Sequence, residues 1–85
     1  MIKKYKACVD GIAGVQHFYF DTVEDLKAGI QNLKTVFHYA GGFDTKRTRV
    51  RIYDSFNYDH ILEKKRYESY PALYRKLAAY ECKAA

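Results

Sequence analysis

A hairpin-and-helix pattern occurs twice in this 85-residue chain, with an offset of about 47 positions. In both copies an aromatic residue, an acid and a hydroxyl residue precede apolar residues at helical spacing. The matched positions are Phe20-Asp21-Thr22 with Tyr67-Glu68-Ser69, Leu26 with Leu73, and Ile30 with Leu77. Two such units form one sheet that carries both helices on one face. The pattern predicts an α+β two-layer sandwich of order ββα-ββα, with a four-stranded antiparallel sheet whose other face meets water or a partner.

The length of the chain limits it to one domain, residues 1–85, in which residues 2–40 and 46–83 form the two repeat units. A chain of this size buries only roughly 60–65% of the surface that it exposes when unfolded, so its core is thin. A deep active site would compete with that core for the same residues. Small size therefore argues against an enzyme.

Alternating apolar and polar residues predict strands over residues 2–9, 15–20 and 46–53, with a turn over 10–14. A fourth strand over 61–67 shows no clean alternation, and its charges suit an exposed edge strand. Thr22 and Ser69 are expected to cap the two helices, and Gly41-Gly42 to end the first. Gly29, inside the first helix, predicts a close approach of that helix to the sheet. The expected apolar stripes are Leu26, Ile30, Leu33, Phe37 and Ala40 in the first helix, and Tyr70, Leu73, Leu77 and Tyr80 in the second.

The alternation assigns each strand residue to one face of the sheet. The side facing the helices is expected to hold Tyr5, Ala7, Val9, Phe18, Phe20, Val50 and Ile52. The outward side is expected to hold Lys4, Lys6, His17, Tyr19, Arg47, Arg49, Arg51 and Tyr53.

The outward side carries the strongest functional signal, because it combines cations with tyrosines. The chain has a net charge of +5 and nine tyrosines, which fits nucleic acid or an acidic protein surface as the partner. Three arginines at alternate positions would lie about 6.6 Å apart along a strand, close to the spacing of phosphates in an extended single strand, roughly 6–7 Å. The candidate binding residues are Lys4, Lys6, Tyr19, Arg47, Arg49, Arg51 and Tyr53. The alternative is an ordinary solvated sheet face, which also carries long polar side chains.

The loop over residues 54–60 is a second candidate, because it carries Phe56 and Tyr58. Exposed aromatic residues on a loop are typical of protein interfaces. The alternative is that both rings fold back over the open end of the core. That alternative is favoured for Phe56, and Tyr58 is left open between the two.

No catalytic site, metal site or cofactor is expected. His17, His38 and His60 are scattered without zinc-site spacing, and Cys8 has no base beside it in the sequence. With Cys82 as its only other cysteine, and without a leader or membrane-spanning run, the chain is expected to be cytoplasmic, with two free thiols and no membrane contact.

Three hypotheses follow for the function. The first is a small non-enzymatic protein that binds nucleic acid, or a nucleic-acid-associated protein, through the basic and aromatic sheet face. The second is an inhibitor or adaptor of the kind encoded by phages and mobile elements, which binds a host protein through its exposed tyrosines and the 54–60 loop. The third is self-association as a homodimer through an edge strand or the sheet face.

Overall fold

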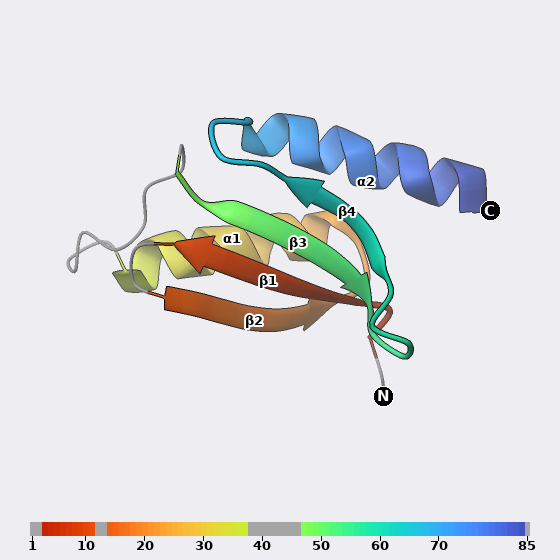
Figure 1. Cartoon of the computed structure of the whole chain (residues 1–85), viewed down its shortest axis with the longest axis horizontal. Helices are drawn as coiled ribbons and strands as arrows, with labels where there is room; N and C mark the ends of the chain where they lie inside the picture. The colour runs from red at the N-terminus through yellow and green to blue at the C-terminus, as the bar shows by residue number, and fades with distance from the viewer. Residues whose placement is uncertain (1–2, 12–13, 38–46, 85) are drawn as a thin grey trace.

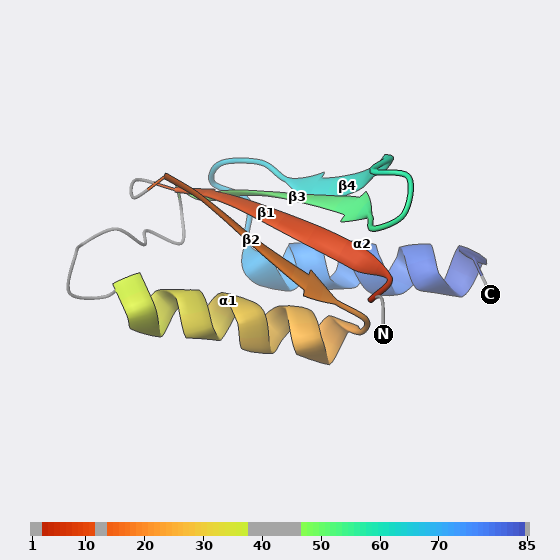
Figure 2. The same ribbon diagram turned by 90° about the horizontal axis from the view of Figure 1, so that it is seen from below.

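The computed structural model describes residues 3–11, 14–37 and 47–84, which form one antiparallel sheet and two helices (Figure 1). The sheet order is β2-β1-β3-β4, and both helices lie on the same face of the sheet (Figure 2). This arrangement confirms the predicted α+β two-layer sandwich. The elements in chain order are β1 (Tyr5–Gly11), β2 (Gly14–Phe20), α1 (Val23–Phe37), β3 (Arg49–Asp54), β4 (His60–Lys64) and α2 (Tyr70–Ala84).

The strand boundaries differ from the prediction at several ends. β1 begins at Tyr5 and continues through Asp10 and Gly11, which had been assigned to the turn. β3 begins at Arg49, so the expected start at residue 46 was wrong. β4 covers residues 60–64 and not 61–67, because Tyr67 has a left-handed backbone with φ of 71° and lies in a turn. The predicted end of the first helix, at residues 40–42, lies outside the described residues.

Both helix starts are capped as the sequence predicts. The hydroxyl of Thr22 accepts the backbone N–H of Asp25 at 3.1 Å, and the hydroxyl of Ser69 accepts that of Ala72 at 3.2 Å. The two halves diverge at the aromatic residue before each cap, because Phe20 is buried whereas Tyr67 is exposed. The two copies therefore share the helix cap and the buried helix residues. They differ in the burial of the aromatic residue that lies two positions before the cap.

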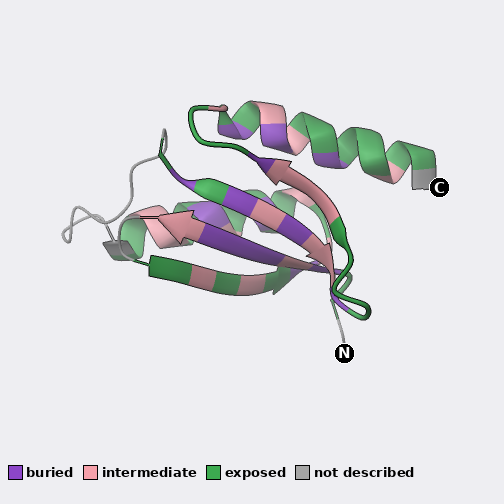
Figure 3. Ribbon diagram, viewed as in Figure 1, coloured by how far each residue is buried: buried purple, intermediate pink, exposed green. Residues whose placement is uncertain are grey.

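The core lies between the sheet and the two apolar helix stripes (Figure 3). The residues expected to face the helices do so: six are buried, and Phe18 is half-buried against the core. In the helices, Tyr80 was expected to complete the stripe but lies outside the buried core and is 39% exposed. The buried core consists of Tyr5, Ala7, Val9, Phe20, Leu26, Ile30, Val50, Ile52, Tyr70, Leu73 and Leu77.

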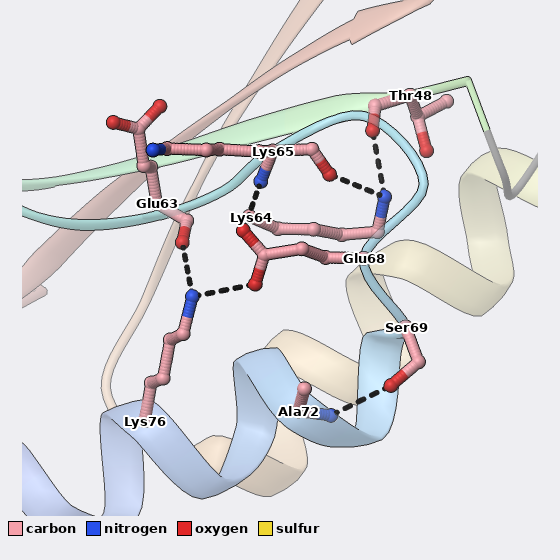
Figure 4. A network of polar contacts seen from close by, with 8 residues as sticks. All are labelled: Thr48, Glu63, Lys64, Lys65, Glu68, Ser69, Ala72 and Lys76. Carbon is pink, nitrogen blue, oxygen red and sulfur yellow. Dashed lines mark hydrogen bonds and ion pairs between the residues drawn. The ribbon is translucent and has the colours of Figure 1, made fainter.

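Lys64 lies in the core, although its charge had suggested an exposed edge position. Its register opposite Val50 turns its side chain toward the helices, and the residue is 0% exposed. The ammonium donates to the carbonyl of Thr48 at 2.7 Å (Figure 4). It also lies 4.8 Å from the centre of the Tyr70 ring. Thr48 and Tyr70 also share a hydrogen bond of 2.7 Å between their hydroxyl groups. Carbonyl and ring contacts thus replace part of the water that the buried cation loses.

At the outer edge of β4 lie Lys76 of α2 and Glu68 of the turn before this helix (Figure 4). Lys76 Nζ donates to the carbonyl of Glu63 at 3.2 Å and forms an ion pair of 2.6 Å with Glu68. Glu68 also accepts the backbone N–H of Lys65 at 3.0 Å. These hydrogen bonds, led by that from Lys76, lower the pKa of the Glu68 carboxyl group.

Gly29 lies where α1 packs closely against β2. A Cβ atom placed on Gly29 would lie 2.4 Å from the Phe18 ring, which is closer than carbon atoms can approach. The position therefore requires glycine for packing, as the sequence predicted, and not for a special backbone angle.

We expect Gly29→Ala to lower the free energy of unfolding by about 1 kcal/mol, because overpacking against Phe18 outweighs the better helix propensity of alanine. Urea denaturation measures the change. In a Phe18→Ala background the same substitution should stabilise the protein, since the ring is gone. A stabilised Gly29→Ala single variant would contradict this account of the close approach.

We also expect stability to fall as pH rises from about 10 to about 12, because burial raises the pKa of Tyr70 from 10.0 to about 12. The fold favours the neutral phenol, so this contribution is complete below pH 10. It is lost above pH 10, by about 2 kcal/mol in all. Urea denaturation at several pH values should show the difference in stability between wild type and Tyr70→Phe shrinking over this range. A constant difference would contradict the assignment.

Candidate functional site

The sheet surface opposite the helices is formed by alternate residues of the four strands, and we call it the free face. No described element covers this surface within residues 3–11, 14–37 and 47–84 (Figure 2). Its residues follow from the strand register and from the burial of their neighbours. They are Val15, His17 and Tyr19 from β2, Lys6, Cys8 and Asp10 from β1, Arg49, Arg51 and Tyr53 from β3, and His60 and Glu63 from β4.

A row of three rings and one cation crosses the free face, one residue from each strand, and we call it the aromatic row. The register places Tyr19 beside Lys6, Lys6 beside Tyr53, and Tyr53 beside His60. The Lys6 ammonium lies 6.0 Å from the centre of the Tyr19 ring. Tyr53 and His60 meet edge to face, with ring centres 5.6 Å apart. The row therefore offers aromatic surface on both sides of a central positive charge.

The loop between β3 and β4 brings a further ring to Lys6. The Asp54 carboxylate accepts the backbone N–H groups of Phe56 and Asn57 at 2.8 and 2.9 Å, which fixes the turn. Tyr58 takes a left-handed backbone with φ of 59°, and its ring centre lies 5.3 Å from the Lys6 ammonium. Tyr58, which the sequence left undecided, is thus an exposed neighbour of the aromatic row.

Phe56 does not cover the core, contrary to the favoured expectation. The residue is 66% exposed, because the turn that the Asp54 carboxylate holds leaves it in solvent. Ser55 is the residue of this loop that is buried, and its backbone N–H donates to the carbonyl of Lys4 at 3.0 Å. Ser55 and the chain before β1 are hydrogen-bonded at the open end of the core, and Phe56 remains exposed.

The charge of the free face is more mixed than the sequence suggested. Arg47 precedes β3, so the expected run of three arginines on one strand reduces to Arg49 and Arg51. Arg49 forms an ion pair with Glu63, with a nitrogen-to-oxygen distance of 3.6 Å. Lys4 also precedes its strand, and it is exposed at the margin of the face. The positive charge nearest the rings therefore comes from Lys6 and Arg51.

Lys6 and Arg51 lie on neighbouring strands at diagonal positions, since Lys6 pairs with Tyr53. Diagonal neighbours on one sheet face are about 7–8 Å apart. Within the part of the chain that the structure describes, neither cation forms an ion pair. Both can therefore meet an anionic group without breaking an internal ion pair.

Cys8 and His17 form a contact that the sequence did not reveal. They face each other across β1 and β2, and Cys8 Sγ lies 3.2 Å from His17 Nδ1. The strand register is the signal that could have found the pair, because it follows from the hairpin. Among the described residues no third metal-binding side chain joins them. The thiol is largely covered, whereas Cys82 on α2 is exposed.

Comparisons of this chain with protein-family models, curated proteins and solved structures find no match. Neither of the two described helices is long and apolar enough to cross a membrane. The site must therefore be interpreted from its own geometry.

We expect a thiol reagent to modify Cys82 rapidly and Cys8 at least about tenfold more slowly, because Cys8 is buried in the sheet and exchanges only through local opening. Mass spectrometry after short exposure to iodoacetamide identifies the modified residue. Equal rates under native conditions would show that β1 and β2 separate readily. In urea both thiols should react alike, which serves as the control.

Proposed function

We propose that this protein binds single-stranded nucleic acid on the free face without acting as an enzyme. The observation that carries the proposal is the aromatic row, in which Tyr19 and Tyr53 flank Lys6. Aromatic rings on an open sheet are suited to stacking with unpaired bases, whose faces a duplex would hide. The two tyrosines lie two strands apart, about 10 Å, which leaves room for two splayed bases.

Lys6 and Arg51 supply the complementary contacts to phosphate. An arginine can bind phosphate through two parallel hydrogen bonds, and a lysine acts as a point charge between the two rings. Lys4, at the margin of the face, adds a further exposed positive charge. The carboxylates of Asp10 and Glu63 lie on the same face, so the charge attraction is moderate and stacking contributes a large share.

The test is fluorescence anisotropy with labelled oligonucleotides of single-stranded DNA and RNA at several salt concentrations. We expect Tyr19→Ala/Tyr53→Ala to weaken binding at least about tenfold, since stacking contributes about 1–3 kcal/mol per base. The salt dependence should remain, because the phosphate contacts are intact. Tyr67→Ala, which removes an exposed tyrosine away from the free face, is the matched control.

The arginine variants give a different signature in the same assay. Arg49→Ala/Arg51→Ala should weaken binding and reduce the slope of log affinity against log salt by up to about 1.4, because about 0.7 counterions are released per phosphate contact and the pair can make two such contacts. Arg66→Ala/Arg75→Ala removes the same charge from exposed positions outside the free face. Equal effects of the two pairs would contradict a role for the free face.

The exposed ring of Phe56 supports a second candidate, an inhibitor or adaptor that binds a protein. Phe56 and Tyr58 are 66% and 60% exposed on a loop whose turn is fixed by hydrogen bonds. An ordered loop with exposed aromatic residues is suited to anchor a protein partner, or a protein associated with nucleic acid.

Affinity capture from a lysate with and without nuclease separates the two candidates. A partner that survives nuclease and is lost with Phe56→Ala favours the protein-binding candidate. A partner that nuclease removes, and that Phe56→Ala retains, favours nucleic acid.

A further inference from the structure

β2 forms an edge of the sheet that no described element covers. The sheet order places β2 and β4 at the two edges, and β2 pairs with β1 alone (Figure 1). A strand paired on one side leaves backbone N–H and C=O groups along its other side. β2 is seven residues long, so this edge can bind another strand along its whole length.

The two edges differ in the features that prevent pairing. The β4 edge is occupied by Lys76, which donates to the carbonyl of Glu63, and it is flanked by charged residues. Charges, bulges and proline are the usual protections of an edge strand. Residues Gly14–Phe20 contain no Asp, Glu, Lys, Arg or Pro, and their pairing with β1 is continuous without a bulge. Val15 and Tyr19 on this strand are 44% and 47% exposed.

A shallow groove of about 340 Å³ runs beside β2, between this strand and α1. The α1 residues that line most of it are uncharged, namely Ala28, Gly29, Asn32 and Leu33. Asp25 and Lys3, of opposite sign, lie at one end. Val36 is exposed one turn after Asn32, on the same side of α1. The margin of the molecule along β2 is therefore a nearly neutral strip on a chain of net charge +5.

A neutral strip of this kind fits a second copy of the chain. The net charge of +5 makes two copies of the chain repel each other. At a contact through β2 this repulsion is smallest, because the strand itself carries no Lys, Arg, Asp or Glu. An acidic or basic partner would gain no charge attraction at this edge. Apolar side chains and backbone hydrogen bonds, which two identical strands can share symmetrically, are what the edge offers.

We infer that two copies pair through β2, antiparallel and about a twofold axis, to form a continuous eight-stranded sheet. The register that pairs all seven residues places His17 opposite His17 and Val15 opposite Tyr19 of the other copy. The contact uses the same strand from both copies, so it closes at two. The helices of both copies then lie on one side, and the two free faces join on the other. This dimer does not depend on the proposed function.

Sedimentation equilibrium of nuclease-treated protein over a range of concentrations tests the dimer. Val15→Lys should raise the dimer dissociation constant at least about tenfold, or about 1.4 kcal/mol. The added ammonium would face Tyr19 of the other copy, and the Lys6 ammonium of that copy already lies 6.0 Å from the same ring. The two like charges would therefore repel each other across the contact. Ala79→Lys, which adds the same charge at an exposed position of α2, should leave the constant unchanged.

Wild-type protein that remains monomeric throughout, or equal behaviour of the two lysine variants, would overturn the inference. Amide hydrogen exchange of the wild-type chain provides a test that needs no variant. Exchange of β2 amides should slow as protein concentration rises, while β4 amides remain unchanged. Protection of β4 amides instead of β2 amides would place the contact at the β4 edge and overturn the inference.

Discussion

The one-sided burial of the sheet is the constraint on which the rest of this structure depends. Both helices cover the same face, and their apolar stripes meet the alternate residues of β1 and β3 at the centre of the sheet. Each buried aliphatic or aromatic side chain contributes about 1.5–3 kcal/mol relative to its exposed state. Because all of this burial lies on one side, the residues of the opposite face do not have to pack against another layer. That surface can therefore vary in composition without loss of the core.

Much of the fold could be predicted from the sequence, because its determinants are local. The hydroxyl caps at Thr22 and Ser69 and the apolar spacing of the helices need no tertiary information. Strand alternation likewise assigned the faces of β1 and β2 correctly. Gly29 indicated a close contact, although only the structure identifies Phe18 as the neighbour.

The remaining features depend on register and on contacts between distant residues. Lys64 faces the core because of its pairing with Val50, and no local pattern in a charged segment reveals that. The Cys8–His17 contact and the shortening of the arginine run likewise depend on where the strands pair and begin. The aromatic row combines one residue from each strand, so the sequence supplied most of its members but not their order across the sheet. Phe56 was placed wrongly because the Asp54 turn sets its direction.

The acidic residues on the free face bear on the nucleic-acid ligand that we propose for this surface. Glu63 holds Arg49 in an ion pair, and Asp10 lies beside Arg49 in the register. A ligand that binds here through phosphate must compete with these carboxylates, whereas a ligand that stacks on the rings need not. Under the proposed function, this mixture of charges gives stacking on the rings a larger role than contact with phosphate alone.

The buried position of Lys64 has a consequence for how the sheet assembles. Its ammonium is held by the carbonyl of Thr48 and by the Tyr70 ring, so the side chain fits only when β4 is aligned with β3 in one way. A slip by one residue would turn Lys64 to solvent and place a neighbouring charge, Glu63 or Lys65, against the apolar helices. Either charge would enter the core away from the carbonyl and ring that receive Lys64. A residue that adds little to the hydrophobic core thus specifies the register of β4 against β3.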